Sequence, residues 1–223
     1  MNTQVQRLGL HDPSIDVCAG HVGDLRFRSL LPAAAWNALP HAVRRRFSER
    51  LAGGDSVVYA GEVTHFHRTW AGWVFCQAAR LIGSPLPLHG DLGMPAVVTV
   101  TEDARSGGQI WTRMYARRGG FPQVVHSAKR FGGATGLEEY VGRGVGMALT
   151  VHVEDGALLF KSAGYFATLL GRRLRLPRWL TPGALTVTHR DCGAGRFLFA
   201  LDVVHPKFGH CIHQAALFKE ASP

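Results

Sequence analysis

Residues 95–117, PAVVTVTEDARSGGQIWTRMYAR, decide the fold, because two alternating runs flank a turn in this stretch. Residues 95–103 and 109–117 each alternate in side-chain character, and a period of two is typical of half-buried strands. Between them, the segment Arg105-Ser106-Gly107-Gly108 supplies residues that tolerate a positive φ, as a hairpin turn requires. The stretch therefore predicts two neighbouring antiparallel strands.

The same pattern continues on both sides of this hairpin, with turn residues at Gly132-Gly133, Glu154-Asp155-Gly156 and Cys192-Gly193-Ala194-Gly195. The predicted strands span residues 57–69, 95–103, 109–117, 122–131, 137–141, 145–154, 157–168, 184–191, 196–204 and 209–219. A sheet of about ten strands joined by hairpins must curl. The sequence thus predicts an α+β fold with a strongly curved, mostly antiparallel up-and-down sheet, either a half-barrel or a barrel.

Two helices are expected beside the sheet. Within residues 34–52, the apolar side chains Leu39, Val43, Phe47 and Leu51 recur every four residues, which predicts one long N-terminal helix with a single apolar stripe. A second, short helix is predicted over residues 71–83, a compact apolar segment that is followed by two prolines.

The composition is that of a globular domain with a sizeable core, since 46% of the 223 residues are hydrophobic and 18% are charged. Residues 1–25 show little periodicity and predict an irregular arm, whereas residues 26–220 predict one curved-sheet domain. The chain has no apolar run of membrane-spanning length, and its opening residues lack the apolar region of a secretory signal. We therefore expect a soluble cytoplasmic protein without stable membrane insertion.

The four cysteines, Cys18, Cys76, Cys192 and Cys211, are scattered without the close spacing of a zinc module or a disulfide scaffold. We expect free thiols, no disulfide and no structural zinc. Nothing in the sequence defines an oligomeric state.

The net charge of +9 attracts acidic or phosphate-rich partners, but no nucleic-acid-binding motif accompanies it, so no nucleic-acid partner is expected. Arginine and apolar side chains alternate most densely in residues 169–180, LLGRRLRLPRWL. This segment has two interpretations. It contacts an anionic membrane surface or guides an acidic substrate, or it extends a strand whose arginine stems cover apolar surface.

The strand over residues 109–117 carries the first candidate ligand site. Its alternation places Trp111, Arg113 and Tyr115 on one face and Ile110, Thr112 and Met114 on the other. If the second face packs under the helix of residues 34–52, the face of Trp111, Arg113 and Tyr115 lines the other surface. We expect that helix to pack against or across the curved sheet, whose concave face encloses a pocket.

A guanidinium between two aromatic rings on a central strand is unfavourable to bury without an acceptor, so Arg113 predicts a carboxylate partner. Glu138 and Glu139 are the nearest candidates along the chain. Two interpretations stay open: Arg113 is the counter-ion of a buried glutamate, or it binds the carboxylate or phosphate of a ligand.

Histidines form the second group of candidates. His65 and His67 lie two residues apart on one predicted strand and so point to one face, the spacing at which a sheet presents two imidazoles to a metal. A third ligand would have to come from His126, His189, His210 or His213. Without a defined third ligand we predict no metal and keep His65 and His67 as ligand-binding candidates.

Acid/base chemistry has its own candidates. His126 titrates near neutrality and could exchange protons together with Glu138, Glu139 or Tyr165. The glycine-rich loops of nucleotide-binding proteins and the nucleophile and zinc motifs of common hydrolases are absent from the sequence. We therefore predict no cofactor.

The order of these features resembles a bacterial domain family of unknown function, whose members occur alone or behind saccharopine-dehydrogenase-like NAD(P)-binding domains. The resemblance runs from about Arg28 to Lys219 and rests on FRSLLPAAAWNALPHAVRRRF, Tyr59-Ala60-Gly61, Trp111-Thr112-Arg113, Leu137-Glu138-Glu139 with Gly142, Leu176-Pro177, Pro182, and His205-Pro206 with Gly209. It implies no established activity or cofactor. It does imply a partner, an NAD(P)-dependent oxidoreductase that acts on the same small substrate.

The leading functional hypothesis is binding of a small apolar or amphipathic metabolite with one anionic group, held by Arg113 between Trp111 and Tyr115 in a cavity on the concave face. One alternative is an isomerase, cyclase or hydratase that uses the same cavity, with proton transfer by His126, Glu138, Glu139 and Tyr165. Another is a structural or interaction domain with a filled polar interior.

Overall fold

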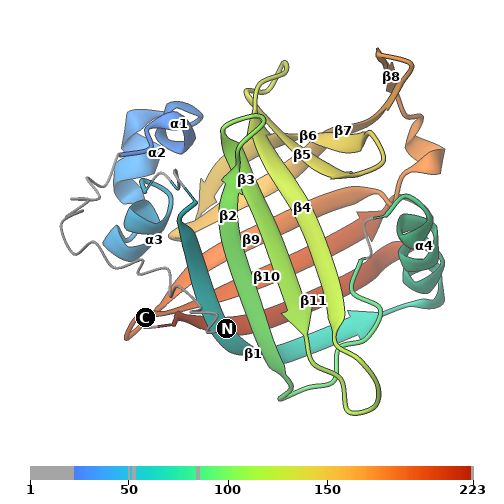
Figure 1. Cartoon of the computed structure of the whole chain (residues 1–223), viewed down its shortest axis with the longest axis horizontal. Helices are drawn as coiled ribbons and strands as arrows, with labels where there is room; N and C mark the ends of the chain where they lie inside the picture. The colour runs from blue at the N-terminus through green and yellow to red at the C-terminus, as the bar shows by residue number, and fades with distance from the viewer. Residues whose placement is uncertain (1–22, 50, 52–53, 84–85, 222–223) are drawn as a thin grey trace, which may run out of the picture.

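Ten antiparallel strands close into a barrel in the computed structural model, which describes residues 23–49, 51, 54–83 and 86–221 (Figure 1). The helical elements are α1 (Arg26–Ser29), α2 (Ala33–Ala38), α3 (His41–Arg46), α4 (Trp70–Leu81) and the 3-10 helix η1 (Arg178–Leu180). The strands are β1 (Ser56–Arg68), β2 (Pro95–Asp103), β3 (Gly108–Tyr115), β4 (Gln123–Phe131), β5 (Leu137–Gly142), β6 (Val145–Glu154), β7 (Ala157–Leu169), β8 (Arg172–Arg175), β9 (Ala184–Gly193), β10 (Arg196–His205) and β11 (Gly209–Glu220).

The strands pair almost entirely in chain order. β1 to β7 form consecutive antiparallel pairs, β7 continues to β9, and β9, β10 and β11 lead back to β1, so the ring has no free edge. β8 lies outside the ring and pairs only with the last residues of β7. The predicted curved antiparallel sheet is confirmed, and of the two expected forms the barrel is the one observed.

Alternation along β2 and β3 sorts side chains between the interior and the outer surface as the sequence predicts. Trp111, Arg113 and Tyr115 are all buried, at 3%, 6% and 2% exposure, while Met114 between them is 41% exposed. The predicted common face of Trp111, Arg113 and Tyr115 is confirmed, and it is the inner face of the barrel.

The prediction of a single helix over residues 34–52 is wrong. α2 ends at Ala38 and α3 begins at His41, because the ring of Pro40 excludes the helical conformation from the preceding residue. Leu39 accordingly has an extended backbone with ψ 144°. α3 ends at Arg46, six residues before the expected end. The apolar stripe is nevertheless buried at Leu39, Val43 and Phe47.

The face of Ile110, Thr112 and Met114 does not pack under these helices. Figure 1 shows α1, α2 and α3 at one end of the barrel, not along its outer wall. Phe47 lies there with its ring 6.5 Å from the Trp111 ring and nearly parallel to it, and 5.6 Å from the Phe160 ring. A closed barrel keeps its apolar side chains inside, so an apolar helix finds its partners at the opening.

The short helix predicted over residues 71–83 is confirmed as α4, at the opposite end of the barrel (Figure 1). Thr69 caps it by accepting a hydrogen bond from the Gly72 amide at 3.2 Å. Gly72 permits its close approach to β11, because a Cβ at this position would lie 2.1 Å from the carbonyl oxygen of Cys211. Among the described residues, no helix combines the length and the apolar character needed to cross a membrane.

The expected N-terminal arm, residues 1–25, lies outside the described residues except for 23–25. Gly23 forms an isolated antiparallel bridge with Glu49, and the buried carboxylate of Asp24 pairs with Arg26 at 2.8 Å. Of the cysteines in the described part, Cys76, Cys192 and Cys211 are free thiols, whereas Cys18 lies outside it. The proposed division at residue 26 stays a prediction.

The aromatic closure by Phe47 leads to the first testable prediction. Replacing Phe47, which is 1% exposed, by alanine leaves a cavity among Phe27, Trp111 and Phe160 and should lower the free energy of unfolding by about 3 to 5 kcal/mol. The matched control is Phe121→Ala, because Phe121 is 92% exposed and its loss should change stability by less than about 0.5 kcal/mol. Urea denaturation measures both, and equal changes would contradict the closure.

Candidate functional site

A cluster of polar side chains, Arg113, Ser127, Lys129 and Glu139, lies inside the barrel. Lys129 Nζ is 3.1 Å from Glu139 Oε1, and Ser127 Oγ donates a hydrogen bond to the same oxygen at 2.6 Å. Arg113 Nη1 donates to Ser127 Oγ at 3.3 Å, and its Nη2 lies 3.9 Å from Glu139 Oε1. We call these four residues the charge cluster.

Strand register brings the charge cluster together. Lys129 on β4 stands directly opposite Glu139 on β5, and Ser127 stands opposite Trp111 on β3. Alternation along β4 then carries Val125, Ser127 and Lys129 to the inner face. The four polar members are at most 6% exposed, so water screens their interactions little.

Electrostatics in the charge cluster favour a charged carboxylate. Burial opposes ionisation of Glu139, but Lys129, Arg113 and the hydrogen bond from Ser127 together hold its pKa below the ordinary value. Burial lowers the pKa of Lys129, and the neighbouring Glu139 opposes that change. With both cations charged, two positive groups face one carboxylate, so the interior carries a surplus of positive charge.

His189 on β9 lies in the same interior, enclosed by aromatic rings. Its ring centre is 5.1 Å from that of Phe47, 5.6 Å from Trp111 and 5.2 Å from Phe199. Burial, reinforced by the positive charges of Arg46, Lys129 and Arg113, lowers its pKa well below the ordinary value of 6.5. The imidazole is therefore neutral in the folded protein at pH 7.

Several buried polar atoms make no hydrogen bond within the described part of the chain: Arg113 Nε, Glu139 Oε2, both ring nitrogens of His189, and both amide atoms of Gln214. Gln214 on β11 stands opposite Leu201 of β10. Buried polar atoms normally have partners. Their concentration in one interior gives this region the capacity to bind a polar group.

A cavity of about 60 Å³ adjoins the charge cluster. Its polar wall includes Arg113, Ser127 and Glu139, while Met147 and Leu201 contribute apolar surface. Leu86 and Pro87, from the segment that follows α4, also line it, and the Cys76 thiol of α4 donates a hydrogen bond to the Pro87 carbonyl at 3.4 Å. Sites for whole metabolites usually enclose about 300 to 1,000 Å³, so this cavity has room only for a small group.

A larger groove of about 500 Å³ opens where β7 separates from β9. The β7–β9 ladder ends at Lys161, and beyond it two side chains connect the strands: the Leu185 amide donates to Ser162 Oγ and Tyr165 OH donates to the Gly183 carbonyl, both at 2.9 Å. Burial raises the pKa of Tyr165 to about 12, so this phenol stays protonated at neutral pH. It serves here as a hydrogen-bond donor.

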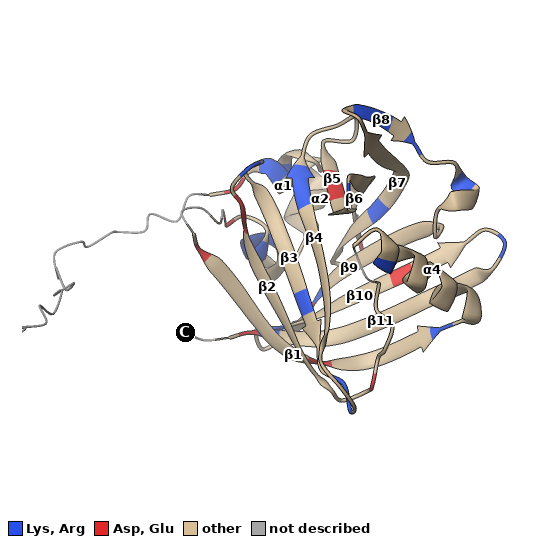
Figure 2. Ribbon diagram, turned by 45° about the vertical axis from the view of Figure 1, so that its right-hand side comes forward, with Lys and Arg blue, Asp and Glu red and all other residues tan. Residues whose placement is uncertain are grey.

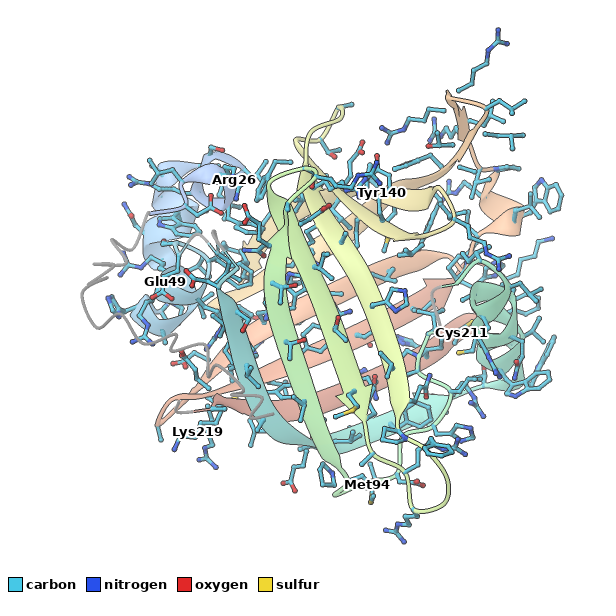
Figure 3. All side chains as sticks on the ribbon, viewed as in Figure 1. Arg26, Glu49, Met94, Tyr140, Cys211 and Lys219 are labelled. Atoms are coloured by element: carbon cyan, nitrogen blue, oxygen red, sulfur yellow. The ribbon has the colours of Figure 1, made fainter. Side chains whose placement is uncertain are left out.

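The four acid/base candidates do not converge. Glu139 is inside the barrel, but the adjacent Glu138 points to the outer face, where Tyr140 (labelled in Figure 3) donates to its Oε2 at 3.1 Å. His126 is exposed on β4, between the buried Val125 and Ser127, and borders the cavity from there. Tyr165 lies at the groove. The arrangement offers no shared centre for proton transfer by all four.

His65 and His67 are both exposed on β1, away from the charge cluster. The His65 ring lies 5.0 Å from that of His213, whose Nδ1 is 2.6 Å from Asp202 Oδ1. Within the described residues, no group of three or more His, Cys, Asp or Glu side chains has the arrangement of a metal site.

Three interior residues were not among the sequence-predicted site residues: Ser127, Lys129 and Gln214. The alternation of residues 122–131 contained a signal for Lys129, because it shares the parity of Val125 and not that of exposed Val124. Which residue stands opposite Lys129 depends on register with β5, and no local pattern defines that register.

Residues 39–218 match the family model of a domain of unknown function, DUF4166. The chain belongs to this family. The DUF4166 match spans most of the chain and includes the whole charge cluster. No match is found among curated proteins. A crystal structure of a point mutant of the fluorescent protein UnaG is similar at a TM-score of 0.31 and 10% identity over 74% of this chain and 95% of that one.

Glu139 is the charge-cluster member whose loss should be most damaging. Glu139→Gln leaves Arg113 and Lys129 buried without a carboxylate, and should lower the free energy of unfolding by about 3 to 5 kcal/mol. Arg113→Met should be milder, because Lys129 still pairs with Glu139. Glu220→Gln, at a surface pair with Arg45, is the control and should change stability by less than about 1 kcal/mol. Urea denaturation ranks the three, and a mild Glu139→Gln would contradict the ion-pair assignment.

His189 should make stability depend on pH. Because its pKa is depressed only in the folded protein, the unfolded chain binds a proton there first, so stability is complete above pH 6.5 and falls as the pH drops below that value. The slope contributed by one such group is at most about 1.4 kcal/mol per pH unit. His189→Phe should remove this contribution, whereas the exposed-site control His41→Phe should keep the wild-type slope in urea titrations at several pH values. Identical slopes for all three proteins would disprove the assignment.

Proposed function

We propose that the barrel binds a small amphipathic molecule whose single anionic group reaches Arg113 and Lys129 inside the barrel. One observation carries this proposal: two buried cations share one carboxylate, and a cavity lined by Arg113, Ser127 and Glu139 adjoins this cluster, with Lys129 behind Glu139. An anion entering the cavity would compensate the surplus positive charge. It would also accept hydrogen bonds from a guanidinium whose Nε has no partner in the described part of the chain.

The apolar part of such a ligand would lie toward α4. The cavity wall away from the charge cluster is apolar, with Tyr115, Leu185 and Leu201 among its residues. Apart from Leu86 and Pro87, every residue that lines the cavity belongs to a strand of the barrel. Since 60 Å³ admits little more than the anionic group, binding of the whole molecule would require displacement of the Leu86–Pro87 segment.

The family resemblance adds a partner to this proposal. We propose that the bound molecule is also the substrate of an NAD(P)-dependent oxidoreductase, with the barrel supplying binding and not hydride transfer. A cytoplasmic location in a bacterium would fit that role. This part of the proposal rests on family context alone.

A structural barrel with a filled interior is the second candidate function. The small cavity volume favours this function. The position of Glu139 favours it too, because this carboxylate already faces both cations. On this hypothesis the charge cluster fixes the register of β3, β4 and β5 and binds nothing. The two candidates differ in how the purified protein responds to an added anionic amphiphile.

Titration with decanoate, followed by calorimetry, tests the proposal, with uncharged decanol as the matched probe. Decanoate should bind more tightly than decanol. Arg113→Met and Lys129→Met should each weaken decanoate binding by tenfold or more, about 1.4 kcal/mol, and leave decanol unchanged. Glu139→Gln removes the competing carboxylate and should strengthen decanoate binding wherever that variant is folded.

Two results would count against ligand binding. If neither probe binds and native mass spectrometry of the purified protein shows no added mass, the filled barrel is the better account. If decanoate binds but neither cation substitution weakens it, the anionic group lies elsewhere.

A further inference from the structure

The segment of residues 169–180, which we call the β8 arm, exposes an unusual amount of apolar surface. It contains the end of β7, the turn to β8, β8 itself and η1. Its exposed apolar side chains are Leu169 (62%), Leu170 (95%), Leu174 (51%), Trp179 (74%) and Leu180 (56%). Figure 3 shows side chains of the arm projecting away from the barrel. The arm therefore does not bury its leucines within the chain.

Besides the β7–β8 pairing, one arginine side chain links the arm to the barrel. Arg173 Nη2 lies 2.6 Å from Glu138 Oε1 on β5, and the Arg173 guanidinium stands 3.5 Å above the ring of Phe166. Glu138 is 4% exposed, so this ion pair is partly shielded from water. The Arg173–Glu138 pair thus holds the arm in place against β5, and the other side chains of the arm project from it.

The other arginines of the arm have no acidic partner. Arg172, Arg175 and Arg178 are exposed, and none forms an ion pair within the described residues. The sequence contains no Asp or Glu between Asp155 and Asp191. Figure 2 shows the resulting basic segments along β8 and the turn that follows it. The surface is at once apolar and positively charged.

More exposed aromatic surface lies on the same side of the molecule. Figures 1 and 2 both show α4 and the β8 arm on the same side of the barrel. Trp70 and Trp73 of α4 are 72% and 47% exposed, and the Trp70 ring lies 5.4 Å from that of Phe208, which is 45% exposed. The β8 arm and the aromatic side chains near α4 are therefore two exposed apolar regions on one side of the barrel.

We propose that the β8 arm docks the barrel onto an anionic lipid bilayer. Leu170, Leu174 and Trp179 would enter the headgroup boundary, where apolar and indole side chains are favourable. Arg172 and Arg178 would pair with lipid phosphates and carboxylates beside them. Charge complementarity favours this partner, and the leucines favour lipid over nucleic acid, in which they would have no matching surface.

The docking is peripheral, and it does not depend on a ligand inside the barrel. The five exposed apolar side chains belong to the last residue of β7, a turn, a four-residue strand and a 3-10 helix, so they reach only the interface. Each arginine near an anionic surface contributes about 1 kcal/mol, which corresponds to about fivefold in affinity. Loss of three arginines should therefore weaken binding by roughly a hundredfold, and added salt should weaken the wild type.

Sedimentation with vesicles tests the proposal, using equal parts of phosphatidylcholine and phosphatidylserine against pure phosphatidylcholine. The wild type should sediment with the mixed vesicles and not with the neutral ones. The triple variant Arg172→Gln, Arg175→Gln, Arg178→Gln should lose this binding. Leu170→Ser with Trp179→Ser keeps every charge and should also weaken it by tenfold or more.

The matched control removes the same charge elsewhere, through Arg28→Gln, Arg105→Gln and Arg118→Gln, all exposed and outside the arm. It should bind mixed vesicles like the wild type. Equal loss in the control and the arm variant would overturn the proposal, because net charge would then explain the attraction. Failure of the wild type to bind mixed vesicles would overturn it as well. Thermal melts establish that each variant is folded, as expected for exposed positions.

Discussion

Closure of the strand ring is the constraint on which the rest of the structure depends. Because β6 pairs with β7 and β11 pairs with β1, every strand of the ring has two neighbours. In each strand of the ring, alternate side chains therefore face the enclosed interior, and those between them face outward. Helices α1 to α3 close one end of that interior (Figure 1). The charge cluster is shielded from water by this arrangement.

Local patterns predicted much of this architecture. The alternation of residues 109–117 correctly placed Trp111, Arg113 and Tyr115 together, because strand geometry alone determines which side chains share a face. A compact apolar segment followed by two prolines gave the nearly correct bounds of α4. The long helix failed for an equally local reason, since a stripe of period four outweighed the proline within it. Pro40 was visible in the sequence, and its effect on Leu39 decides the break.

The composition of the charge cluster could be predicted only in part from local sequence patterns. Arg113 was expected to have a carboxylate partner, and Glu139 lies within 3.9 Å of it. Glu138 and Glu139 were equal candidates, because choosing between adjacent residues requires the parity of β5 relative to the ring. Lys129 stands opposite Glu139 only through the β4–β5 register, which closure of the whole sheet determines. Its position sets two basic side chains, Arg113 and Lys129, against one glutamate inside the barrel.

The separation of β7 from β9 has a consequence for motion. Over most of the ring, neighbouring strands are joined by continuous ladders of backbone hydrogen bonds, but after Lys161 these two are connected by the side chains of Ser162 and Tyr165. Hydrogen bonds of this kind contribute about 1 kcal/mol each. Parting the wall at this place therefore requires far less free energy than unfolding a strand. The barrel wall is therefore weakest at the end of the β7–β9 pair beyond Lys161, and transient widening there would admit solvent while the remaining pairings stay intact.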